Sequence, residues 1–161
     1  MTQFQGNPDD EQLVRELAQS VLQQTAPEEL LLFDETAAEY FADPPGVLDA
    51  RGRDEPVGFG LELAMVTPVV LAALTPVVQY LLAVAADALK VEVRPVVVRW
   101  VRALLHHGQD PGETAPTPAL TPAQAARVRQ LSRDRAVQLG MSQADADLLA
   151  DSVVGGMAVL A

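Results

Sequence analysis

The sequence feature that most constrains the fold is an uncharged run at residues 63–86, which reads LAMVTPVVLAALTPVVQYLLAVAA. As an α-helix it would extend about 36 Å, whereas the hydrocarbon core of a bilayer is about 30 Å thick. Runs of this kind are typical of transmembrane helices, and also of helices buried on all sides within a protein. The residues that mark the predicted membrane segment are Leu63, Thr67, Pro68, Leu71, Thr75, Pro76, Gln79 and Ala86.

The run contains a Thr-Pro pair twice, at Thr67-Pro68 and at Thr75-Pro76. Within one helix each proline removes a backbone donor, and membrane helices tolerate this because hydroxyls and neighbouring helices satisfy the freed carbonyls. Thr followed by Pro is also a helix-start signature, with Thr as the cap. The alternative to a membrane segment is therefore a pair of short, buried helices at the centre of a soluble bundle.

Charge is distributed unevenly along the chain. Residues 1–62 hold 14 acidic and three basic side chains, whereas residues 90–107 hold four basic and one acidic. Such asymmetry indicates an oriented surface or a membrane. Because residues 94–107 also predict an amphipathic helix, they suit the surface of an anionic membrane. The predicted interfacial residues are Lys90, Arg94, Arg99, Trp100 and Arg102. The alternative is that these arginines pair with the acidic N-terminal helices.

Two helices are expected before the uncharged run. Asn7 and Pro8, followed by acidic residues, predict a helix start. A capping-box pattern at residues 25–28 predicts the second start, and the Asp-Pro-Pro-Gly sequence at 43–46 predicts its end. The short connection between the two helices predicts a helical hairpin. Residues 47–60 are expected to form a connector.

A proline-rich stretch divides the C-terminal part from the rest. Residues 108–121 predict a linker, so the expected domains are a helical domain at 1–107 and a helical hairpin at 122–161. Thr121 and Ser142 are the predicted caps of its helices, and Gly140 the end of the first. Because the hairpin has few apolar residues, we expect it to dock on a partner. The predicted partner-binding residues are Leu148, Leu149, Val153 and Met157.

Reactive chemistry is poorly represented in the sequence. There is no cysteine, and the net charge of −11 disfavours nucleic acid as a partner. The two histidines, His106 and His107, are adjacent and would diverge on a helix. No phosphate-binding loop or zinc motif is present. We therefore expect no catalytic residue, no metal site and no cofactor, and a protein that is not an enzyme.

Together these patterns predict an all-α protein: an N-terminal helical hairpin, a long proline-containing apolar helix, a basic amphipathic helix and a tethered C-terminal hairpin. The favoured function is action at a membrane, with 63–86 as an inserting or pore-forming segment beside the interfacial helix 94–107. The alternative is a soluble adaptor or assembly subunit with 63–86 as its core and the C-terminal hairpin as its protein-binding module. The expected partners are membrane lipid, a protein or another copy. Without a signal peptide pattern, cytoplasmic synthesis is expected, followed by membrane association or cytoplasmic residence.

Overall fold

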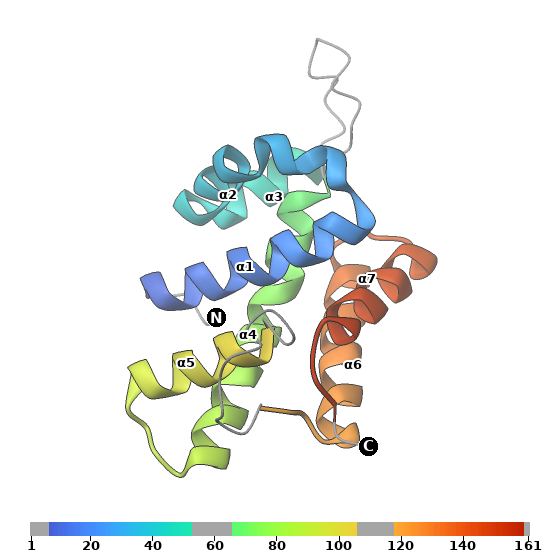
Figure 1. The fold of residues 1–161 in the computed structure, drawn as a ribbon. Helices are drawn as coiled ribbons and strands as arrows, with labels where there is room; N and C mark the ends of the chain where they lie inside the picture. Colours follow the sequence, from blue (N-terminus) through green and yellow to red (C-terminus); the bar gives the residue numbers. More distant parts are fainter. Residues whose placement is uncertain (1–6, 53–65, 106–117, 160–161) are drawn as a thin grey trace.

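The computed structural model describes residues 7–52, 66–105 and 118–159, which form an all-α fold (Figure 1). The predicted all-α class is thereby confirmed. In this described part, β-structure is limited to one bridge between Leu120 and Val159. The elements are α1 Pro8–Thr25, the 3₁₀ helix η1 Pro27–Leu32, α2 Phe33–Ala42, α3 Pro44–Gly52, α4 Thr67–Leu89, α5 Arg94–Leu105, α6 Pro122–Gln138 and α7 Gln143–Gly155.

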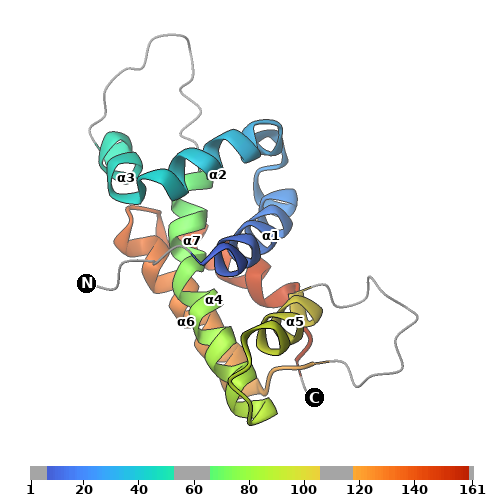
Figure 2. The same ribbon diagram turned by 90° about the vertical axis from the view of Figure 1, so that its left-hand side faces the viewer.

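Helix α4 is the centre of the fold. Helices α1 and α5 cross it on the same side, α2 and α3 lie at its N-terminal end, and α6 runs along another side (Figures 1 and 2). Every residue from Thr67 to Leu74 is buried. This enclosure explains the apolar run, because a helix with neighbours on all sides requires apolar residues all round.

Both Thr-Pro pairs lie in this one helix. Pro68 occupies the first turn, whereas Pro76 lies inside the helix. The Thr75 hydroxyl donates to the Leu71 carbonyl oxygen at 2.9 Å. The second pair therefore continues the helix, in agreement with the predicted long proline-containing helix, and the alternative of two short helices is wrong.

The N-terminal elements match the sequence patterns in part. Asn7 caps α1 as predicted, because its side chain accepts from the Asp9 amide at 3.0 Å. The predicted capping box at Thr25 is wrong: its hydroxyl donates back to the Val21 carbonyl at 3.0 Å, and a 3₁₀ helix follows. Helix α2 ends at Ala42 as expected, but α3 begins at Pro44, where a connector was expected to follow. Helices α1 and α2 contact α4 more extensively than they contact each other.

Helix α5 returns along α1 after a turn in which Lys90 adopts a left-handed conformation, with φ of 53°. Its inward face carries Val97, Val101 and Leu104, as the helical spacing predicts. Ion pairs join its other flank to α1: Arg94 binds Asp10, and Arg102 binds Glu16. The basic helix thus contacts the acidic N-terminal helix.

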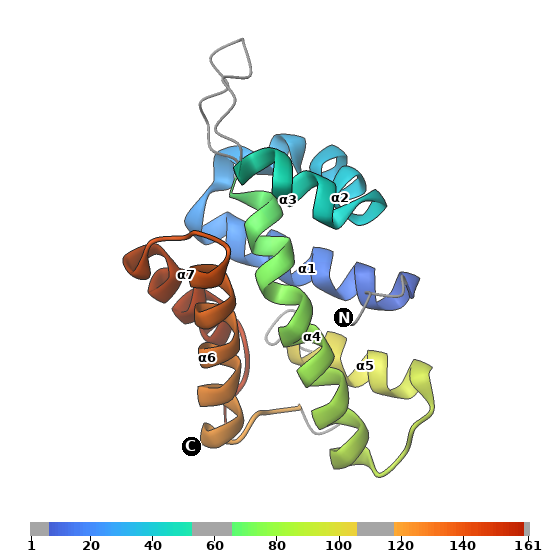
Figure 3. The same ribbon diagram turned by 180° about the vertical axis from the view of Figure 1, so that it is seen from behind.

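Helices α6 and α7 form a hairpin on α4 and α1 (Figure 3). The predicted capping box of Thr121 with Gln124 is present, and Ser142 caps α7. Gly140 follows α6 with φ of +100°, a conformation that favours glycine. The buried residues of the hairpin belong to the same hydrophobic core as those of α1 and α4. The division into domains stays a prediction, since most of the expected linker lies outside the described residues.

Candidate functional site

A buried carboxylate fixes the beginning of α4. Glu29, on η1, is 6% exposed, and its Oε2 atom accepts from the Val66 amide at 3.1 Å. Its Oε1 atom accepts from the Thr67 amide at 3.3 Å and from the Thr67 hydroxyl at 3.2 Å. The first amides of a helix lack partners within the helix, so this carboxylate supplies the missing acceptors. We call this arrangement the Glu29 clasp.

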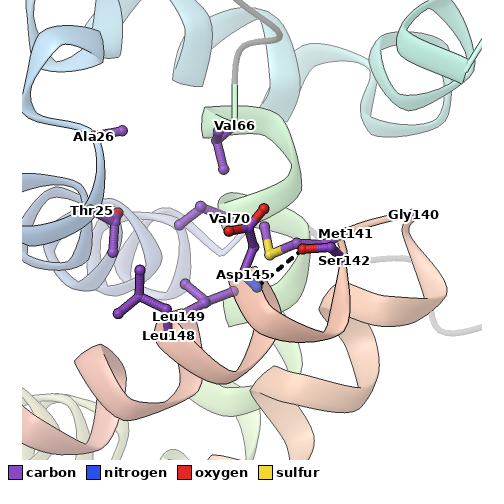
Figure 4. A pocket seen from close by; sticks show the side chains of 10 residues that line it. All are labelled: Thr25, Ala26, Val66, Val70, Gly140, Met141, Ser142, Asp145, Leu148 and Leu149. Carbon is purple, nitrogen blue, oxygen red and sulfur yellow. Dashed lines mark hydrogen bonds between the residues drawn. The ribbon is translucent and has the colours of Figure 1, made fainter.

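The Glu29 clasp positions one side of a pocket of about 310 Å³. The pocket lies between the end of α1, the first turn of α4 and the turn from α6 to α7 (Figure 4). We call it the hairpin groove. Its lining residues are Thr25, Ala26, Val66, Val70, Gly140, Met141, Ser142, Asp145, Leu148 and Leu149.

The chemistry of the hairpin groove is simple. Most of the lining is apolar, and two of its three polar side chains already take part in local hydrogen bonds. The Thr25 hydroxyl donates to Val21, and the Ser142 hydroxyl accepts from the Asp145 amide at 3.1 Å. The exposed Asp145 is the one charged residue among the described residues of the lining. Such a groove can hold an apolar side chain together with a cationic group.

The predicted partner-binding residues occupy two different environments. Leu148 is 56% exposed at the hairpin groove, and Leu149 is buried in its lining. Val153 and Met157 are buried in the core. A partner can therefore reach Leu148 on the folded chain, whereas it can reach Val153 or Met157 only if the hairpin opens. Sequence reasoning missed Ala26 as part of this site. It missed the α4 residues too, because no short-range pattern shows that α4 begins beside α7.

The predicted membrane residues lie along α4, except for Leu63, which is outside the described residues. Thr67, Pro68 and Leu71 are buried within the protein. Thr75, Pro76 and Ala86 are partly buried, and Gln79 is exposed. In the described part of the chain, α4 is the one helix long and apolar enough to cross a membrane, a test that core helices of soluble proteins also pass.

The predicted interfacial residues are divided between internal contacts and solvent. Arg94 and Arg102 hold α1, as the alternative interpretation of these arginines expected. Trp100 is partly buried against the core. Lys90 and Arg99 are exposed, and they are the members of this group that remain available for another molecule.

Among the described side chains, no group of three histidine, aspartate or glutamate residues is placed to hold a metal ion. Burial raises the pKa of the Tyr40 phenol, against the opposing effects of a hydrogen bond with Thr75 and the positive charge of Arg135. Tyr40 is not in the lining of the hairpin groove. Comparisons with models of protein families, with curated proteins and with solved structures find no match for this chain.

Proposed function

We propose that the protein is a soluble, non-enzymatic adaptor or assembly subunit that binds another protein chain at the hairpin groove. The observation that carries the proposal is the exposure of Leu148 beside this apolar groove. Exposed leucine next to an apolar concavity is typical of a surface that a partner covers.

The environment of α4 supports the soluble form of this proposal. Its first eight residues are buried among other helices, and the Glu29 clasp satisfies the amides of Val66 and Thr67. Because these contacts are made within the chain, α4 needs no lipid to cover its first half. The hairpin α6–α7 covers another part of α4, and its turn forms the hairpin groove together with the N-terminal end of α4.

Photo-crosslinking tests the proposed function. A photoreactive amino acid at position 148 of the full chain should form a discrete protein adduct in expressing cells, because a partner covers this position. The matched control is position 137: Val137 is also exposed, at 37%, but lies on α6 outside the groove. Protein adducts that are absent at 148, or equal at 148 and 137, would contradict the proposal.

Action at a membrane is the second candidate function, and the length and mean hydropathy of α4, 23 residues and 2.1, favour it. In this case the surrounding helices must leave α4 before it enters the bilayer. Flotation with vesicles that contain anionic lipid tests this function, because anionic lipid attracts exposed basic residues. Recovery of the folded chain with the vesicles, resistant to carbonate washing, would support it. Recovery of all the protein in the soluble fraction would exclude it under these conditions.

A further inference from the structure

We propose that the partner bound in the hairpin groove is a second copy of this chain, which inserts its α4–α5 turn and the start of α5. This inference rests on the proposed function, since it names the occupant of the same groove. The argument is one of complementarity between two exposed surfaces at different ends of one molecule.

The hairpin groove requires an apolar segment that also carries positive charge. Its lining offers apolar contacts from Met141 and Leu148 and a single charge, on Asp145. None of the described residues that line the groove is basic. The adjoining η1 carries the exposed acidic Glu28, which adds negative charge on this side of the molecule. Electrostatic complementarity therefore favours a cationic segment over an acidic one.

The α4–α5 turn has the required composition. Three exposed valines, Val91, Val93 and Val96, are 37%, 58% and 40% exposed. The exposed Lys90 and Arg99 flank them, with Glu92 as the acidic residue within this stretch. Apolar side chains exposed next to cations are thus concentrated in one short segment.

Other basic residues of the described chain are less suited to the groove. Arg129 pairs with Asp151, and Arg133 pairs with Asp147, both within the hairpin itself. Arg94 and Arg102 are paired with α1. Arg127 and Arg135 are exposed on α6, where Val137 is the one exposed large apolar residue. Within the described chain, the segment 90–99 is therefore the one that combines available cations with several exposed apolar side chains.

The occupant has to come from another molecule because the two surfaces lie at opposite ends of α4. Val66 and Val70 of the groove are at the N-terminal end, and Lys90 follows the C-terminal end. A helix of 23 residues is about 34 Å long, so one chain cannot place its own turn in its own groove without unfolding. Figure 3 shows the α4–α5 turn and the α6–α7 turn at these two ends. Such a head-to-tail contact adds further copies, which form a ring where the rotation closes and an open filament where it does not.

Reciprocal charge reversal tests this contact in the full chain. Analytical ultracentrifugation of the unaltered protein should show reversible self-association that weakens with salt, because a charge pair contributes to it. Asp145→Lys and Arg99→Glu should each weaken association by about tenfold or more, since each places like charges opposite one another. An equal mixture of the two variants should recover association. In the mixture, Asp145 of one variant meets Arg99 of the other, and the two altered side chains also have opposite charges.

The controls separate a lost contact from a lost fold. Arg127→Glu reverses an exposed charge on α6 outside both surfaces, so association should stay unchanged. Circular dichroism should show the same helicity for all variants; if either reversal unfolds the chain, Asp145→Asn and Arg99→Gln replace it, with a smaller loss expected. A monomer at all concentrations, or a mixture that fails to recover, would overturn the inference.

Crosslinking from position 148 distinguishes failure of this inference from failure of the proposed function. In the purified protein, the inference expects an adduct of twice the chain mass, joined within residues 90–99. An adduct in cells with a different protein, without self-association, would overturn the inference and leave the proposed function supported. Absence of any protein adduct in either setting would contradict both.

Discussion

The two halves of α4 have similar compositions but different surroundings. From Thr67 to Leu74 every residue is buried. From Thr75 onward the helix has an exposed side that includes Gln79, Ala83 and Asp87. Helices α1, α2 and α3 lie near the first half, whereas α5 crosses the second half (Figure 3).

This difference shows that an uncharged run can satisfy two structural requirements at once. The first half is apolar because it has neighbours on every side, and the exposed side of the second half carries small or polar residues. Alanine at an exposed position favours a helix and adds little apolar surface. Hydropathy averaged over the run therefore hides the boundary near Thr75, where burial changes from complete to one-sided.

A charge placed in each half should have very different effects on stability. Leu71→Asp should lower the free energy of unfolding by about 4 kcal/mol or unfold the chain, because Leu71 is fully buried and the new carboxylate has no partner. Ala83→Asp, in the exposed side of the second half, should change it by less than about 0.5 kcal/mol. Urea unfolding followed by circular dichroism measures both values. Equal effects of the two changes would contradict the difference between the halves.

The Glu29 clasp belongs to the fully buried half, so its loss should be the next largest effect. Glu29→Ala should cost about 2 kcal/mol, because buried amides of α4 lose a charged acceptor. Glu28→Ala is the matched control: Glu28 is the adjacent residue and is exposed. In thermal unfolding, the melting temperature of Glu29→Ala should be well below that of Glu28→Ala. A melting temperature equal to that of the control would show that the clasp contributes nothing to stability.

Local features of the fold could be predicted from the sequence, whereas contacts between distant segments could not. The caps at Asn7, Thr121 and Ser142 are set by residues within one turn, so their patterns predict them correctly. The Glu29 clasp joins residues 37 and 38 positions apart, and nothing in either segment indicates the other. For the same reason the sequence pointed to Leu148 but not to the α1 and α4 residues that complete the groove.

Failures of prediction also had local causes. Thr75 stands directly before a proline and Thr25 two residues before one, yet each hydroxyl donates to a carbonyl four residues earlier instead of capping a new helix. A threonine shortly before a proline is compatible with both arrangements, and the packing of the surrounding helices decides between them. Its apolar side chain alone would place Val137 of α6 inward with Val128, but Val137 is 37% exposed whereas Val128 is buried.

The smallest expected effect concerns Tyr40 of α2, at the boundary between the two halves. Tyr40 is 6% exposed, and its phenol lies near enough to Thr75, the first residue of the second half, for Thr75 to lower its pKa. Tyr40→Phe should lower stability at neutral pH by about 1 kcal/mol, because the polar interaction of the phenol with Thr75 is lost. Thr36→Ser, a change of one methyl group at a buried position of the same helix, provides a control for general perturbation of α2.

The pH dependence of the same variant provides a sharper test. Because burial raises the pKa of Tyr40 above its ordinary value of about 10, the folded chain keeps the phenolic proton at a pH where the unfolded chain has lost it. The stability from this difference is fully present below the unfolded pKa and is lost as pH rises through the folded pKa. Urea unfolding in steps above pH of about 10 should show a steeper fall for the unaltered protein than for Tyr40→Phe. Parallel curves would mean that Tyr40 is solvated in the folded chain, and that the boundary at Thr75 is open to water.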